Sequence, residues 1–98
     1  MLVHSVFFWL RSDLTSAERL KFDTLLDALK GVKSAEKVYI GTPAATGDRP
    51  VVDSTYTVAL TVLFKDLAAH DAYQVDPLHQ MFLTCKASWT RVQIYDAA

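Results

Sequence analysis

The segment 72–82 holds the residues best suited to chemistry, because Tyr73 and His79 lie six positions apart around a predicted helix start. Asp76 is a favoured N-cap residue, and Pro77 suits the first helical position, where its missing N–H costs no hydrogen bond. We therefore expect a helix to begin here, with His79 in its first turn. The positive end of the helix dipole disfavours a cationic imidazole. This placement predicts a neutral histidine that can act as a base.

Each candidate residue also has a purely structural interpretation. His79 can hydrogen-bond a loop carbonyl and fix the turn, and Tyr73 can be a core aromatic whose hydroxyl reaches water. His4 lies among apolar neighbours near the start of the chain, where a lone histidine is typical of a core. His70 lies in a short polar helix with Asp71 beside it and is interpreted as a solvated side chain.

Length and composition exclude several classes of function. The 98 residues predict a single domain over residues 1–98, and the net charge of −1 offers no basic surface for nucleic acid. The apolar run at the start ends at Arg11, too early to span a bilayer. Cys85 is the only cysteine, and no Cys/His pair has zinc-site spacing, so neither a disulfide nor a metal is expected. We expect a cytoplasmic protein without nucleic-acid or membrane partners.

The hydrophobic pattern predicts alternating strands and helices. Period-2 and apolar runs predict strands over residues 2–10, 37–41, 55–64 and 90–96. Helical spacing and capping signals predict helices over residues 16–30, 67–74 and from 76–77 through about 86. In the long strand, alternation places Tyr56 on the same face as Val58 and Leu60. The segment 42–53 is rich in glycine and proline and is expected to be a mobile connection.

The element order β-α-β-β-α-β is typical of an α+β ferredoxin-like antiparallel sheet, with both crossover helices on one face. The other face of such a sheet carries no helix. Burying an apolar face stabilises by roughly 25 cal/mol per Å2, before the costs of association are subtracted. Two sheets packed face to face would close into a barrel. We therefore expect a homodimer, in the form of a dimeric α+β barrel.

Several motifs together resemble the stress-responsive A/B barrel family, called Dabb, and the resemblance covers nearly the whole chain. The motifs are Val3-His4 on the opening strand, Gly31-Val32, the strand ending in Gly41, and Tyr73 followed by Asp76-Pro77-Leu78-His79. The resemblance implies a dimeric α+β barrel with a pocket between sheet and helices. The family includes plant stress proteins of uncertain activity and a plant polyketide cyclase, so the resemblance leaves open whether this chain is an enzyme.

The resemblance to the cyclase also suggests roles for individual residues. The catalytic pair of the cyclase corresponds to Tyr73 and His79, and the histidine on its opening strand corresponds to His4. By analogy, His79 would abstract a proton next to a carbonyl and Tyr73 would stabilise the developing enolate, with no metal or organic cofactor. A further histidine of the cyclase is replaced here by Val58, which makes the predicted ligand-binding pocket more apolar and predicts a different substrate.

Three functional hypotheses follow from these residues. The first is a homodimer that binds a hydrophobic or phenolic small molecule near His4, Val58, Tyr73 and His79, with cyclase-like acid/base chemistry. The second is a non-catalytic stress or structural dimer. The third is a cofactor-free monooxygenase that acts on electron-rich phenols with dioxygen. We rank the third hypothesis below the others, because Tyr73 and His79 match the pattern of the Dabb family and no residue favours a monooxygenase over a cyclase.

Overall fold

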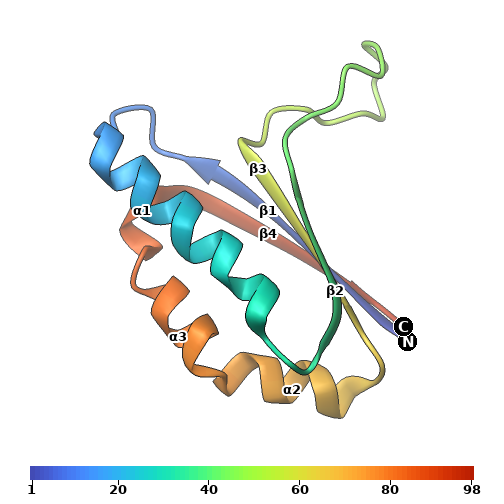
Figure 1. The fold of residues 1–98 in the computed structure, drawn as a ribbon. Coiled ribbons are helices and arrows are strands. Elements are labelled where there is room, and N and C mark those ends of the chain that lie inside the picture. Colours follow the sequence, from blue (N-terminus) through green and yellow to red (C-terminus); the bar gives the residue numbers. More distant parts are fainter.

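Four strands form one antiparallel sheet in the computed structural model, which describes residues 1–98 (Figure 1). They are β1 (Leu2–Leu10), β2 (Ala35–Gly41), β3 (Val58–Phe64) and β4 (Trp89–Ala97). Their order across the sheet is β2-β3-β1-β4, and every neighbouring pair is antiparallel. This topology confirms the predicted ferredoxin-like α+β fold.

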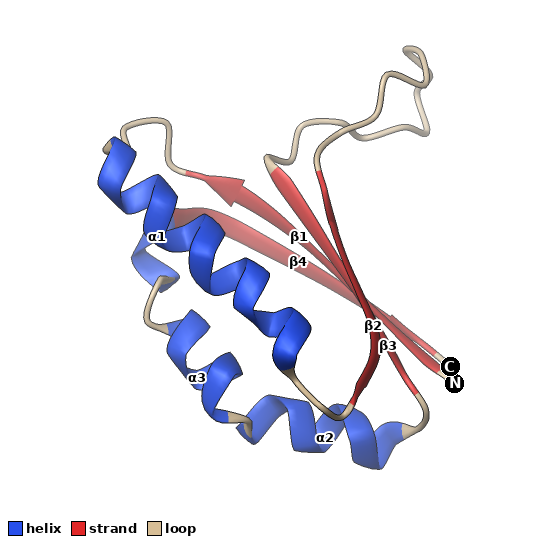
Figure 2. Cartoon of the chain, viewed as in Figure 1, coloured by secondary structure: helices blue, strands red, loops and turns tan.

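The helices all lie on one face of the sheet (Figure 2). They are α1 (Ser16–Asp27), α2 (Leu67–Val75) and α3 (Pro77–Leu83), with short 3₁₀ turns at Ala28–Gly31 and Lys86–Ser88. The first and last predicted helices are therefore shorter α-helices followed by 3₁₀ turns, a common way for helices to end. None of the three combines the length and apolarity that crossing a lipid bilayer requires.

Side-chain caps explain where the helices begin. At α1 the Thr15 hydroxyl accepts from the Glu18 amide at 3.1 Å, and the Glu18 carboxylate accepts from the Thr15 amide at 2.9 Å. This is the capping box that the sequence predicts. At α3 the Asp76 carboxylate accepts from the Leu78 amide at 2.8 Å, with Pro77 at the first helical position. The sequence signal for this helix start is thereby confirmed.

The core lies between the sheet and the helices. Even-numbered residues of β1 and β3 point toward the helices because side chains alternate along a strand. The largest fully buried side chains are those of Phe22, Leu26, Leu29, Leu60, Val62, Phe64 and Tyr73. The apolar alternation of the two central strands therefore fixes which face receives α1, α2 and α3.

The long strand begins later than predicted, at Val58 rather than at residue 55, and Tyr56 lies on the opposite face from the one expected. The Tyr56 ring contacts those of Phe7 and Trp9, at centroid distances of 5.1 and 6.5 Å, on the face without helices. The chain bends at Thr57, so alternation cannot be extended back across this residue. The strand prediction was wrong here because the alternating residue types continue past the bend.

Candidate functional site

An apolar cavity of about 280 Å3 lies between the sheet and the helices α2 and α3. Nine of its thirteen lining residues are hydrophobic. The lining comprises His4, Val6, Phe8, Leu60, Tyr73, Gln74, His79, Phe82, Leu83, Lys86, Trp89, Val92 and Ile94. Val92 and Ile94 keep large exposed areas although they face the helical side, because β4 is an edge strand. The cavity wall therefore continues to the open edge of the sheet.

His79 is held by the break between α2 and α3. The helix α2 ends at Val75, so the carbonyl of Gln74 has no partner within its own helix. The Nδ1 of His79 lies 3.2 Å from this oxygen, and the side-chain amide of Gln80 donates to it at 2.7 Å. A carbonyl only accepts hydrogen bonds, so Nδ1 carries the proton. The Nε2 of the neutral ring is therefore the basic nitrogen.

Burial lowers the pKa of His79, and the Gln74 carbonyl opposes this effect. The nearby His4 imidazole acts in the same direction as burial, as would any second positive charge at short range. The direction agrees with the neutral histidine that the sequence predicts. The main physical cause is removal from water, whereas the sequence pointed to the helix dipole. At neutral pH the side chain is thus an uncharged base beside an apolar cavity.

Tyr73 lies against His79, with ring centroids 4.7 Å apart. Its side chain is buried, and burial raises the pKa of the phenol well above its usual range. The hydroxyl therefore stays protonated at neutral pH and can donate a hydrogen bond. No group of the chain holds this hydroxyl by a hydrogen bond that would stabilise its phenolate, since burial alone accounts for the shift. It is available to a molecule in the cavity.

His4 joins the same wall from β1. It is a buried polar side chain, and its ring centroid lies 5.9 Å from that of Tyr73. His70 is also half-buried, with its ring 5.3 Å from His4 and 5.5 Å from Phe64. The interpretation of His70 as a solvated side chain was wrong. The first turns of α2 lie over the sheet, and His70 is on the side of the helix that faces it.

Val58 lies apart from this cavity. It is buried and lines a shallow hollow formed with α1 and the end of β2, together with Leu26 and Ile40. The residue of β3 that lines the cavity is Leu60, two positions further along the same face. Sequence reasoning also missed Gln74, whose carbonyl orients His79. The helix break at Asp76-Pro77 is the signal that could have identified it, because it leaves the preceding carbonyls without partners.

A family model described as the stress responsive A/B barrel domain, Dabb, matches residues 2–97. The chain belongs to this family. A search of curated proteins finds no match. The fold of this Dabb domain also resembles those of solved structures, at low sequence identity.

Three of these solved structures illustrate the range. A Dabb family protein from Mesorhizobium loti has 22% identity and a TM-score of 0.73, with 99% of this chain and 94% of that chain covered. A dimeric ferredoxin-like protein of unknown function from Thermobifida fusca has 18% identity and a TM-score of 0.77, with coverage of 99% and 89%. A hydroxynitrile lyase from Passiflora edulis has 17% identity and a TM-score of 0.77, with coverage of 98% and 90%. These similarities show the fold.

Proposed function

We propose that this Dabb domain is a homodimer that binds a hydrophobic or phenolic small molecule in the cavity and uses His79 as a general base. The observation that supports the proposal is the hydrogen bond between the His79 ring and the Gln74 carbonyl. It leaves Nε2 unprotonated in a residue that lines an apolar cavity. A buried base with a lowered pKa is a feature of sites that move protons.

The lining of the cavity sets the class of ligand. Its volume of about 280 Å3 is close to the lower end of typical ligand pockets, which begin at about 300 Å3. Aromatic and aliphatic side chains from both layers suit a planar apolar ring. The polar groups are few, and they are concentrated at His4, Tyr73, Gln74 and His79. Lys86 is the only lysine or arginine in the lining. A phenol or an aryl ketone matches this distribution.

The proposed step is removal of a proton from carbon next to a carbonyl group. The C–H bond breaks, its proton forms an N–H bond with His79, and the electron pair moves onto the carbonyl oxygen. The Tyr73 hydroxyl donates a hydrogen bond to this developing enolate. The enolate carbon can then attack a second carbonyl of the same molecule, and the imidazolium returns its proton to the new alkoxide. This is the ring closure expected of a cyclase-like lyase.

The homodimer is supported by the face of the sheet without helices. Aromatic side chains gather there from three segments, namely Phe7 and Trp9, Tyr56, and Tyr95. The guanidinium of Arg91 lies 4.2 Å from the centre of the Trp9 ring. A second copy of this face offers matching aromatic surface. The Thermobifida fusca protein, described as dimeric, has the same fold.

A non-catalytic dimer is the second candidate. Its support is the same bond of His79, because a histidine and Gln80 that both satisfy one helix-end carbonyl also fix the turn between α2 and α3. Under this hypothesis, replacing His79 lowers the melting temperature and changes no ligand binding. The two candidates are therefore separated by measurements on folded variants.

A thermal-shift screen with phenols, β-ketones of polyketide type and fatty acids tests the binding proposal. We expect one class to raise the melting temperature of the wild type and to lose this effect in His79→Ala. Met81→Ala is the matched control, because Met81 lies in the same helix with an exposed side chain. Binding that is identical in all three proteins, or no binding by any class, would favour the non-catalytic dimer.

Deuterium incorporation tests the catalytic step. A ketone ligand in D2O is followed by NMR, and we expect the wild type to accelerate exchange of its α-protons. Removal of the hydrogen-bond donor in Tyr73→Phe should slow exchange by about a hundredfold with little loss of binding, the scale for loss of one such donor. His79→Ala should abolish exchange. Consumption of dioxygen in the presence of a phenol, without any deuterium exchange, would instead indicate a monooxygenase.

A further inference from the structure

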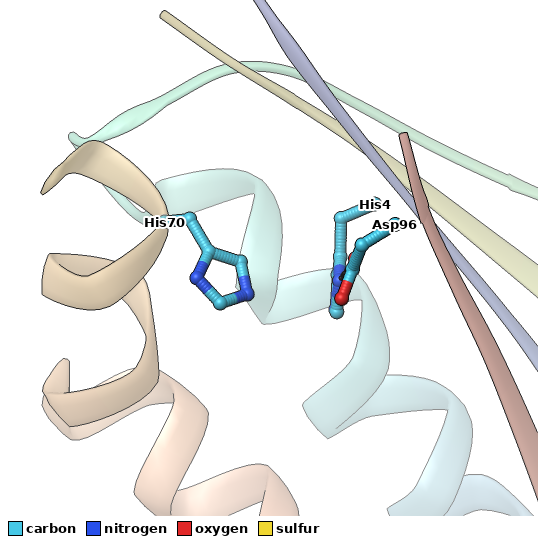
Figure 3. Close-up of side chains that lie close together, drawn as sticks. All are labelled: His4, His70 and Asp96. Atoms are coloured by element: carbon cyan, nitrogen blue, oxygen red, sulfur yellow. Dashed lines mark hydrogen bonds and ion pairs between the residues drawn. The ribbon is translucent and has the colours of Figure 1, made fainter. Parts of the chain in front are cut away.

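Three potential metal ligands meet at one end of the sheet, and Figure 3 shows their side chains. They are His4 on β1, His70 on α2 and Asp96 on β4. One ligand atom from each residue lies within 4.8 Å of the others. The ring of His70 points toward the pair formed by His4 and Asp96 (Figure 3). Two imidazoles and one carboxylate thus converge from three different elements.

The backbone fixes the pair of His4 and Asp96. These residues lie directly opposite each other in the register of β1 and β4, on the side of the sheet that faces the helices. The Nδ1 of His4 is 2.5 Å from Oδ1 of Asp96. Directly opposite residues of an antiparallel pair have closely spaced side chains whatever else surrounds them. Two of the three candidate ligands are therefore placed by strand register.

His70 is oriented as a ligand by its neighbours. Its Nδ1 lies 3.1 Å from the Asp71 carboxylate, which can only accept, so Nδ1 carries the proton. The Nε2 then carries a lone pair, which accepts from the side-chain amide nitrogen of Gln74 at 3.3 Å, and a metal ion would take the place of this donor. A carboxylate that holds one nitrogen of a histidine while the other binds metal is the usual outer arrangement of histidine-metal sites.

Access and chemistry are also suited to an ion. The side chains of His4 and His70 are 5% and 16% exposed, while that of Asp96 is 46% exposed and leaves a path from solvent. Calcium and magnesium prefer all-oxygen ligands, whereas two imidazoles and one carboxylate suit first-row transition ions. Zinc sites with three protein ligands keep a fourth position for water or another molecule.

We propose that His4, His70 and Asp96 form a binding site for a divalent transition-metal ion, with Zn2+ as the best match. Bonds of about 2.1 Å in a tetrahedral site place the ligand atoms about 3.4 Å apart, so the three side chains need shifts of roughly 1 Å. Rotation of the half-buried His70 ring is the simplest such shift. The metal site shares His4 with the lining of the cavity, but it uses neither Tyr73 nor His79, so loss of metal binding and loss of ligand binding can be separated by variants.

Titration of chelator-treated protein with Zn2+ by isothermal calorimetry tests the site. We expect one ion per chain with micromolar affinity. His70→Gln and Asp96→Asn each remove a ligand, and each should weaken binding at least about a hundredfold, while Asp71→Asn should weaken it about tenfold through loss of orientation. His79→Gln is the matched control, because it removes the one histidine outside the cluster. It should leave the affinity unchanged.

Cobalt adds a spectroscopic measurement. Co2+ at a four-coordinate site should give intense visible absorption that Zn2+ displaces, and this band should vanish in His70→Gln and Asp96→Asn. Circular dichroism establishes that each variant is folded. Millimolar or weaker binding by the wild type, binding that survives in both ligand variants, or equal loss in His79→Gln would overturn the proposal. In those cases His4 and Asp96 form a hydrogen-bonded pair only.

Discussion

At the scale of single residues, the state of His79 results from two opposing effects. Burial disfavours the charged ring, and the Gln74 carbonyl favours it by accepting a hydrogen bond from Nδ1. The carbonyl also selects the tautomer, a task that burial alone cannot perform. Burial therefore keeps the ring neutral, and the Gln74 carbonyl orients it. The structural interpretation of His79 and the catalytic one rest on this same hydrogen bond.

The lowered pKa of His79 predicts a dependence on pH. By NMR, the His79 ring should titrate with a midpoint below about 6.5, the value of an unperturbed histidine. The unfolded chain then binds a proton before the folded one does. The contribution of His79 to stability therefore falls as pH decreases through about 6.5 and becomes constant below the folded-state pKa.

His79→Gln identifies the resonance and removes this part of the pH dependence. Urea unfolding at several pH values between neutral and mildly acid should show a shallower loss of stability in the variant. A midpoint at or above that of free histidine in the wild type would contradict the proposed neutral base.

At the scale of elements, the short break between α2 and α3 does most to build the cavity wall. Asp76 ends one helix and caps the next, so the chain turns without a long loop. The turn brings Tyr73, in the last turn of α2, against His79 in the first turn of α3. A single continuous helix would place these side chains six residues apart, more than one and a half turns along the axis and on different faces.

Paired cap variants test this role. Asp76→Ala and Thr15→Ala each remove a side-chain cap, and each should lower the free energy of unfolding by about 1 kcal/mol in urea denaturation. Only Asp76→Ala should also accelerate amide hydrogen exchange in α3 and move the ring resonances of His79. Thr15→Ala is the control, because it should lower the free energy of unfolding by a similar amount at a different helix. Unchanged His79 resonances in Asp76→Ala would show that Pro77 alone is sufficient to set the turn.

At the scale of the whole molecule, the sheet has one covered and one uncovered face. The uncovered face carries aromatic side chains on both central and edge strands, including Tyr95, which is 63% exposed. A specific dimer buries roughly 800 Å2 on each partner. Because β1 and β3 form the centre of this face, partner contacts there would also support the strands that hold the cavity.

A charge on this face should separate the proposed dimer. We expect Tyr95→Glu to sediment as a monomer at micromolar concentration, because an isolated carboxylate in an apolar interface is costly. Leu20→Glu is the matched control, since Leu20 is 66% exposed on α1 in the helical layer. It should sediment as the wild type does. A wild type that is already monomeric at tens of micromolar would refute the homodimer.

Much of this molecule follows from sequence pattern. The alternation in residues 2–10 and 58–64 and the caps at Thr15 and Asp76 act over a few residues, so they predict the elements and their order. Tyr73 and His79 were identified for the same reason, because one local helix signal joins them. Tyr56 was placed on the wrong face because a bend leaves no mark in the pattern of residue types.

The remaining parts of the site depend on distant segments. His4, His70 and Asp96 meet only through the register of β1 with β4 and the docking of α2, and their spacing in the chain matches no metal motif. The place of Val58 outside the cavity depends on where α1 covers β3. These are consequences of three-dimensional packing, and a pattern of nearby residues carries no information about them.

The position of β1 at the centre of the sheet has a consequence for biosynthesis. Its two neighbours are β3 and β4, so β1 leaves the ribosome before either of its partners has been made. At translation rates of about 5–20 residues per second, the apolar strand stays unpaired for seconds. His4 meets Asp96 only across a separation of 92 positions. The nascent chain is therefore open to chaperones and to aggregation until β4 has been added.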